Sequence, residues 1–231
     1  ILGSNGLVGS SLSRILDNSE NVQEIIASTR NDTNLFNFDE TKKLIENTKP
    51  NILINAAAKV GGIYANNTKR SDFILDNLKI NLNILENCIP FPEIKIINLG
   101  SSCIYPLNAE NPIKEEYIMS GNLEPTNSPY AMAKLTAIEM SDAMSKQHGH
   151  SITNIMPTNL YGPNDNFSIT DSHVIPGLIH RMYNAKKENN EVFKIWGSGK
   201  PLREFLFVDD LSKCIDFIIK EGIDKNLINV G

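Results

Sequence analysis

The chain has 231 residues, 41% of them hydrophobic and 21% charged, which suits a globular protein with a substantial core and excludes a disordered one. Its formal net charge of −5 shows no basic excess, so neither nucleic-acid binding nor a membrane-surface role is favoured. No apolar run approaches the roughly 20 residues that cross a bilayer. Three cysteines are too few for a secreted disulfide framework, and we expect a cytoplasmic protein.

Apolar runs alternate with amphipathic stretches along the chain. Apolar residues at helical spacing predict helices at 6–16, 39–46, 71–88, 128–147, 174–187 and 208–221. Asp39 is predicted to cap the second of these helices. Short apolar runs predict strands at 24–29, 52–56, 94–99, 152–156, 193–196, 204–207 and 227–230. Short strands that are apolar on both faces and alternate with helices are typical of a parallel, doubly wound α/β sheet.

The first motif is a glycine loop between a strand end and a helix start, with the sequence Gly3-Ser4-Asn5-Gly6-Leu7-Val8-Gly9. Glycines there permit a tight turn and let backbone N–H groups approach a pyrophosphate, whose charge the helix N-terminus favours. The loop predicts a dinucleotide-binding, Rossmann-type fold, with a plain glycine turn as the alternative. Arg30 follows the second predicted strand, where an arginine pairs with the 2′-phosphate of NADP. A solvated surface arginine is the alternative there.

The domain boundary is predicted near Tyr161, where longer loops rich in Gly and Pro begin. We expect residues 1–160 to form the NADP-binding domain and residues 161–231 to form mainly a smaller substrate-binding region. Residues 204–231 are expected to return partly to the main sheet. Both ends of the chain read as the interior of a fold, so we expect the smaller region to be truncated at its C-terminus.

A tyrosine and a lysine four residues apart form the second motif. Tyr130 and Lys134 share one helix face, where an ammonium favours the phenolate and is expected to lower the pKa of the tyrosine. Such a phenol exchanges a proton with a carbonyl oxygen, and Ser101, after an upstream strand, polarises the same carbonyl. Tyr183 and Lys187 repeat the spacing without such a serine, so we predict that they lie on a helix surface.

These motifs resemble those of the extended short-chain dehydrogenase/reductase family. Three longer strings carry the resemblance: residues 57–63 with Asn66 and Asn67, residues 100–106, and residues 157–166. Within the family they are similar to enzymes that invert C3 and C5 of GDP-4-keto-6-deoxy-D-mannose and reduce C4. The resemblance implies NADP(H) as the cofactor and that GDP-sugar as the substrate. It also implies a homodimer that pairs through helices 71–88 and 128–147.

The resemblance implies a role for each matching residue. It makes Ser101, Tyr130 and Lys134 the catalytic triad, and Cys103 and His173 the acid–base pair of epimerisation. Residues implied to hold the GDP-sugar are Arg181, Trp196 and Arg203. Implied cofactor contacts are Leu99, Gly100, Ser101, Ser102, Lys134, Pro157, Thr158, Asn159, Leu160 and His173. Asn5 departs from the pattern, since some members have arginine there, and this leaves more of the NADP preference to Arg30.

The proposed pair for epimerisation has ordinary chemistry. A free thiol has a pKa near 8.5, so Cys103 can act as the base once a neighbouring cation lowers its pKa. The imidazole of His173, whose ordinary pKa is about 6.5, suits the opposing acid. The plain alternatives are a small buried cysteine and a helix-capping histidine. The remaining groups are predicted to have structural places: Cys88 and Cys214 in the core, His148, His150 and His180 outside any constellation, and Asp209 and Asp210 at a helix N-terminus. No cluster has metal-ligand spacing.

Two other functions stay open at this point. A nucleotide-sugar 4-epimerase or 4,6-dehydratase shares the glycine loop and the triad, but dehydratases are expected to carry an acidic pair where Ser102 and Cys103 stand. A non-catalytic NADP-binding regulatory module shares the fold, but it has no need of an intact Ser101, Tyr130 and Lys134.

Overall fold

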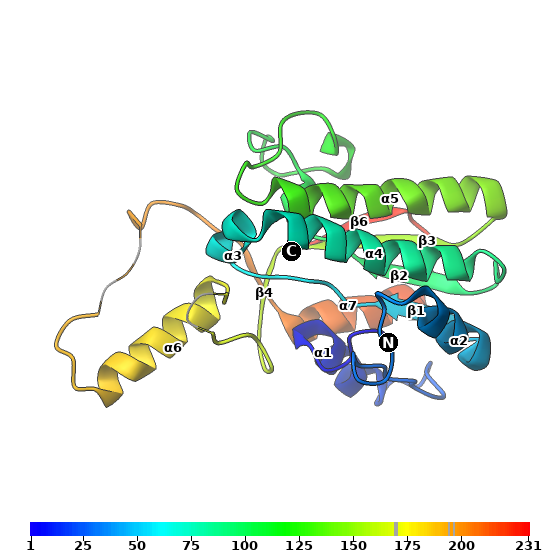
Figure 1. The fold of residues 1–231 in the computed structure, drawn as a ribbon, viewed down its shortest axis with the longest axis horizontal. Coiled ribbons are helices and arrows are strands. Elements are labelled where there is room, and N and C mark those ends of the chain that lie inside the picture. Colours follow the sequence, from blue (N-terminus) through cyan, green and yellow to red (C-terminus); the bar gives the residue numbers. More distant parts are fainter. Residues whose placement is uncertain (169–170, 194, 196) are drawn as a thin grey trace.

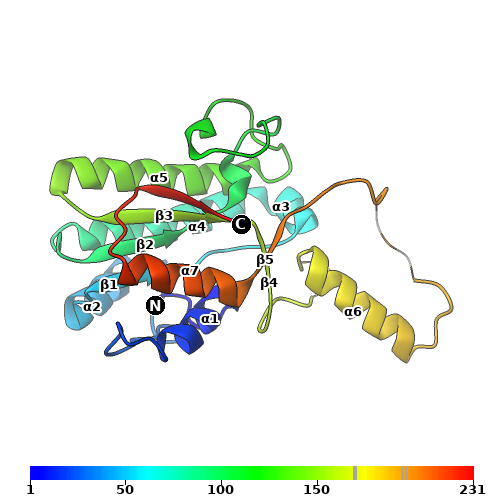
Figure 2. The ribbon, with the colours of Figure 1, turned by 180° about the vertical axis from the view of Figure 1, so that it is seen from behind.

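A four-stranded parallel sheet forms the centre of the computed structural model, which describes residues 1–168, 171–193, 195 and 197–231. Its strands lie in the order β1 (Ile52–Asn55), β2 (Lys95–Leu99), β3 (Ile152–Pro157) and β6 (Leu227–Val230). Helices α4 (Arg70–Cys88) and α5 (Ser128–His148) cover one face, and α1 (Leu7–Leu16) and α7 (Val208–Lys220) cover the other (Figures 1 and 2). The doubly wound α/β fold is therefore confirmed.

Both faces of each strand are apolar because both faces are covered. Ile54, Ile97 and Ile155 pack on the face of α1 and α7, whereas Leu53 and Ile96 pack on the opposite face. Successive residues of a strand point to opposite sides, so a strand between two helical layers needs apolar residues at every position. The helix α2 (Phe38–Thr48) packs against α4 and extends the helical layer that α4 and α5 form.

An arm leaves the carboxyl end of the sheet after β3. It contains β4 (Asn159–Tyr161), α6 (Val174–Lys187) and the chain that returns to β5 (Phe205–Phe207), which pairs with β4. Figure 1 shows α6 projecting away from the main sheet. The 3-10 turns η1 (Ser102–Ile104) and η2 (Glu115–Tyr117) lie beyond β2. Among the helices that the structure describes, none is long and apolar enough to cross a bilayer.

The predicted strand at 24–29 is wrong. In that segment only Ser28 forms an isolated bridge, to Leu2, which in turn bridges to Asn55. The segment that would pair with it contains only Ile1 and Leu2, because Gly3 already turns into the glycine loop. Two residues provide too few ladder hydrogen bonds to order a full strand beside them.

Two further expectations need correction. Asn37, not Asp39, caps α2: its side-chain oxygen accepts hydrogen bonds from the backbone N–H groups of Asp39 and Glu40. Two elements of the structure, the short helix α3 (Ile63–Thr68) and the strand β4, had no counterpart among the predicted elements. Of the strand predicted at 193–196, residues 193 and 195 have no strand structure, and residues 194 and 196 lie outside the described residues.

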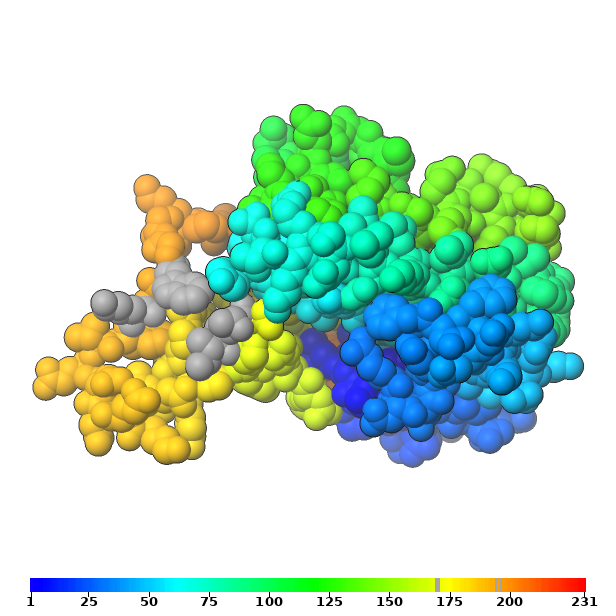
Figure 3. Space-filling model, viewed as in Figure 1, coloured from blue at the N-terminus to red at the C-terminus, as the bar shows by residue number. Residues whose placement is uncertain are grey.

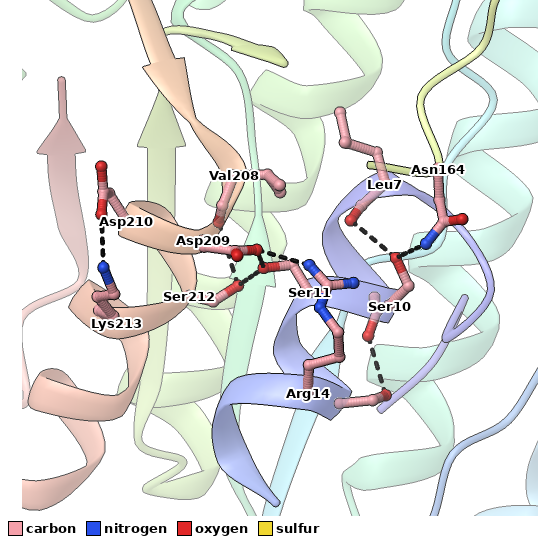
Figure 4. Close-up of polar contacts among 12 residues, drawn as sticks. Leu7, Ser10, Ser11, Arg14, Asn164, Val208, Asp209, Asp210, Ser212 and Lys213 are labelled. Carbon is pink, nitrogen blue, oxygen red and sulfur yellow. Dashed lines mark hydrogen bonds and ion pairs between the residues drawn. The ribbon is translucent and has the colours of Figure 1, made fainter. Parts of the chain in front are cut away.

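A polar cluster joins α1 and α7, the two helices that share one face of the sheet (Figure 4). Asp209, in the first turn of α7, accepts hydrogen bonds from Ser11 and Arg14 of α1, both at 2.6 Å. Ser212 donates to Ser11 at 2.8 Å. On the other side of α1, Asn164 of the arm donates to Ser10 at 3.1 Å. Asp209 therefore has the structural place predicted for it, and α1 is fixed to both α7 and the arm.

Buried amides cross the sheet in a ladder. The side chain of Asn98 accepts from Asn55 at 2.9 Å and donates to Asn154 at 3.1 Å, and these three residues are register partners on β1, β2 and β3. Asn154 donates in turn to Asn226 at 3.0 Å. Because buried amides are stable only when they are paired, the ladder favours this strand register over its alternatives.

We predict that Asn98→Leu lowers the free energy of unfolding by about 1–3 kcal/mol, because it removes a partner from two buried amides. Urea denaturation measures the change. Asn47, exposed on α2, provides the control: Asn47→Leu should change the free energy of unfolding by less than about 0.5 kcal/mol. Equal stability of the two variants would contradict a structural role for the ladder.

Candidate active site

The glycine loop folds as a cradle that side chains would fill. Gly3 has a φ of +74°, and a Cβ built on it would lie 2.9 Å from the backbone of Ala57. A Cβ on Gly9 would collide with the carbonyl oxygen of Gly3. Gly6 precedes α1, and no described side chain caps this helix end. The first N–H groups of α1 are thus available to an anionic group that approaches the loop.

A pocket of about 320 Å³ opens beside this cradle, between Gly3, Gly6 and the segment 28–36. In the space-filling view, the dark-blue N-terminal residues lie in a recess between the light-blue segment and the yellow arm (Figure 3). Arg30 lines the pocket, with its guanidinium 5.5 Å from the centre of the Phe36 ring. Glycine cradle, helix end and arginine together fit a phosphorylated dinucleotide.

The predicted triad residues gather where β2 ends. Lys134 is 3% exposed, and its ammonium donates to the carbonyl oxygen of Leu99 at 2.6 Å. The same ammonium lies 5.8 Å from the centre of the Tyr130 ring, which packs edge-on against Phe73. The Ser101 hydroxyl accepts from the backbone N–H of Cys103 at 3.4 Å, which caps the turn η1. Ser101, Cys103, Tyr130 and Lys134 form what we call the β2 cluster.

Desolvation dominates the acidity of the β2 cluster. It raises the pKa of Tyr130, with Cys103 adding to the increase and a hydrogen bond from Ser101 opposing it. The expected decrease from Lys134 is therefore wrong for this structure. Desolvation also raises the pKa of Cys103 to about 11, against the opposing effects of Ser101 and Lys134. It lowers the pKa of Lys134 to about 8. At neutral pH the phenol and the thiol are both protonated.

His173 lies outside the β2 cluster, directly before α6. His173 is exposed as a residue, yet desolvation by the surrounding chain lowers the pKa of its imidazole, and the charge of Asp165 opposes this decrease. Asp165 is half-buried, desolvation raises its own pKa, and within the described part of the chain its Oδ2 has no hydrogen-bond partner. A role for Asp165 was not predicted from the sequence, although this residue lies within the string 157–166.

The other predicted site residues are spread over the arm. Arg181, on α6, donates to the Gly177 carbonyl at 3.2 Å and lies 5.9 Å from the Phe193 ring. Arg203 is exposed, and Trp196 lies outside the described residues. None of the described contacts joins His173, Arg181 or Arg203 to the β2 cluster. The predicted cofactor contacts at 157–160 run from the carboxyl end of β3 into β4.

Residues predicted to be structural have structural places. Cys88 is fully buried, Cys214 of α7 is partly buried against the core cluster between α7 and the sheet, and Tyr183 is 64% exposed. Among the described residues, no three His, Cys, Asp or Glu side chains form a group that could hold a metal ion.

Comparison with known proteins settles the family. The model of the NAD dependent epimerase/dehydratase family matches residues 1–231. The chain belongs to this family. It is 42% identical over 231 residues to a GDP-L-fucose synthase of Sinorhizobium fredii, covering all of this chain and 73% of that protein.

Two solved structures extend the likeness. A GDP-L-fucose synthetase from Naegleria fowleri bound to NADP is 32% identical, with a TM-score of 0.87 over 99% of this chain and 74% of that one. A GDP-mannoheptose C4 reductase from Campylobacter jejuni with NADP bound is 29% identical, with a TM-score of 0.85 over 100% of this chain and 78% of that one.

For this family member we predict that Arg30→Ala weakens binding of NADPH far more than binding of NADH. Only NADPH carries a 2′-phosphate, and loss of one charge-assisted contact costs about 1.5–3 kcal/mol. Fluorescence titration of each cofactor measures the two dissociation constants. Lys43, exposed on α2, offers a control in Lys43→Ala. Equal losses for the two cofactors would show that Arg30 does not contact the phosphate.

Proposed function

We propose that this chain catalyses the NADPH-dependent 3,5-epimerisation and 4-reduction of GDP-4-keto-6-deoxy-D-mannose, with GDP-L-fucose as the product. The observation that carries the proposal is the thiol of Cys103 inside the β2 cluster. A plain ketone reductase needs Ser101, Tyr130 and Lys134 but has no use for a thiol beside them. The GDP-L-fucose synthases among the relatives support the same assignment.

Residues 1–160 would hold the cofactor, with the glycine loop at its pyrophosphate and Arg30 at its 2′-phosphate. Bound there, NADPH supplies a hydride to C4 of the keto sugar. Residues 161–203 would hold the GDP-sugar through Arg181, Trp196 and Arg203, while residues 204–231 partly return to the sheet. The homodimer through α4 and α5 and the cytoplasmic location stay predictions from the sequence.

Reduction at C4 needs a proton donor for O4. The hydroxyls of Ser101 and Tyr130 would both donate hydrogen bonds to O4 and stabilise charge that develops on it. The raised pKa of Tyr130 keeps its phenol protonated until the proton is needed. Lys134, fixed on the Leu99 carbonyl, would hold the nicotinamide ribose and balance the charge on the phenolate that remains.

Epimerisation needs a base on one face of the sugar and an acid on the other. The ketone at C4 acidifies the hydrogens at C3 and C5, and the same hydroxyls stabilise the enolate. Cys103 would accept these protons after losing its own, a loss that Ser101 and Lys134 favour. His173 would return protons from the opposite face, and Asp165 stabilises its protonated form.

A C4 reductase without epimerase activity is the second candidate function. Two observations favour it: none of the described contacts joins His173 to the β2 cluster, and burial keeps Cys103 protonated at neutral pH. The 4-epimerase, the 4,6-dehydratase and the regulatory module that the sequence left open have no comparable observation in their favour.

The two chemistries should be separable by mutation, and this tests the proposed function. Cys103→Ser should slow exchange of the C3 and C5 hydrogens with D₂O by at least about 100-fold, because a serine hydroxyl is a far weaker acid than a thiol. Oxidation of GDP-L-fucose by NADP⁺ should stay near the wild-type rate in this variant. Tyr130→Phe should slow the oxidation far more than the exchange, because the hydroxyl of Ser101 still stabilises the enolate. Mass spectrometry follows the exchange, and absorbance of NADPH follows the oxidation.

The pH dependence provides a check on the same assignment. Burial raises the pKa of Cys103 to about 11 and lowers the pKa of His173. Between about pH 7 and 9 the thiolate fraction therefore rises while the imidazolium fraction falls, so wild-type exchange that needs both groups should stay nearly independent of pH. Exchange at the wild-type rate in Cys103→Ser would contradict the epimerase assignment and leave the C4 reductase. Cys214→Ser is the matched control, since that thiol is carried by α7 and packs against the core cluster between α7 and the sheet.

A further inference from the structure

The segment that precedes His173 docks on a loop of the main body. The backbone N–H of Gly62 donates to the carbonyl oxygen of Asp171 at 3.0 Å. The ammonium of Lys69 lies 3.4 Å from both carboxylate oxygens of Asp171. These contacts link the start of α3 and α4 to the arm across more than a hundred residues of sequence. Asp171 lies two residues before His173, the proposed acid of epimerisation.

The docking leaves no space for a side chain at position 62. A Cβ built on Gly62 would collide with the carbonyl oxygen of Ser172, and its next contact would again be with the backbone of Ser172. A Cβ on Gly61 would lie 3.1 Å from the Phe73 ring, so the neighbouring position is close-packed as well. The contact is backbone on backbone, and only glycine at position 62 permits it.

The loop that carries Gly62 is itself held on both sides. The buried amide of Asn66 donates to the carbonyl oxygens of Gly61 at 2.6 Å and Gly62 at 3.2 Å. Asn77 of α4 accepts from the backbone N–H of Lys59 at 3.1 Å and donates to its carbonyl at 3.0 Å. Because buried hydrogen bonds hold the loop, a clash at Gly62 is relieved by movement of the 171–173 segment.

We propose that Gly62 is a positioning residue for His173: its N–H and its bare Cα form the seat that fixes the 171–172 segment, and the seat sets where the imidazole meets the substrate. The inference rests on the proposed function for the role of His173, but the docking itself does not. The ion pair of Lys69 and Asp171 supports the seat from outside, where its charges are partly solvated. Gly62 touches no reacting atom in this scheme.

Gly62→Ala provides the first test. It should lower C3 and C5 exchange with D₂O at least about tenfold, since a displaced acid cannot return the proton, and leave the rate of GDP-L-fucose oxidation within about threefold. Hydrogen–deuterium exchange of the backbone should rise in the peptide 171–177. Gly149→Ala is the matched control: Gly149 has a φ of +76° and open space around it, so an alanine there is strained but does not touch the arm.

A charge reversal provides the second test, which stands even if Gly62→Ala fails to fold. Lys69→Glu should repel Asp171, lower the C3 and C5 exchange and loosen the peptide 171–177. Combined with Asp171→Lys, it should return both readouts to within about threefold of wild type, because the reversed pair attracts again. If the two side chains do not act as a pair, the double variant shows no such rescue.

The results that overturn the inference are specific. Unchanged backbone exchange at 171–177 in Gly62→Ala would show that there is no seat, and equal losses of epimerisation and oxidation would show that the seat does not act through His173. A wild-type protein that oxidises no GDP-L-fucose would instead overturn the proposed function, while the backbone exchange still decides the docking.

Discussion

The hydrogen bond from the buried ammonium of Lys134 to the carbonyl oxygen of Leu99 organises the rest of the site. A buried cation is costly unless it is paired, so this contact fixes helix α5 against the end of strand β2. With the helix fixed there, Tyr130 lies one turn earlier on the same face and Ser101 lies just past the strand end. The ammonium also partly offsets the desolvation of Cys103, whose thiol would otherwise be still less acidic.

The sheet supplies the frame on which that contact depends. Parallel strands end at one edge, and α1, α4 and α5 all begin or end near it, so the glycine loop and the β2 cluster lie on the same side of the molecule (Figures 1 and 2). The amide ladder through Asn98 keeps the strand ends in register. The arm carries His173 and Arg181, for which we propose roles at the substrate, and it is attached to the main body through Gly62 and Asn164.

Sequence alone reached the parts of the site that depend on local spacing. Tyr130 and Lys134 lie four residues apart on a helix, and the glycines of 3–9 act within one turn, so their geometry follows from the helix itself. The predicted cap of α2 was Asp39, but Asn37 caps the helix. The capping residue depends on backbone angles at the helix start, which the amino-acid sequence does not show directly. Three other features depend on tertiary packing, which the spacing of residues in the sequence does not predict. They are the hydrogen bond of Gly62 to Asp171, the effect of the Asp165 charge on His173 and the pKa of Tyr130.

The most direct measurement of the central claim is the isotope pattern of the product. The purified protein would convert GDP-4-keto-6-deoxy-D-mannose with unlabelled NADPH in D₂O, and NMR would locate deuterium in the sugar. The account predicts GDP-L-fucose with deuterium at C3 and C5 and with hydrogen from the cofactor at C4. A reduced sugar that keeps hydrogen at C3 and C5 and the original configuration there would contradict the account.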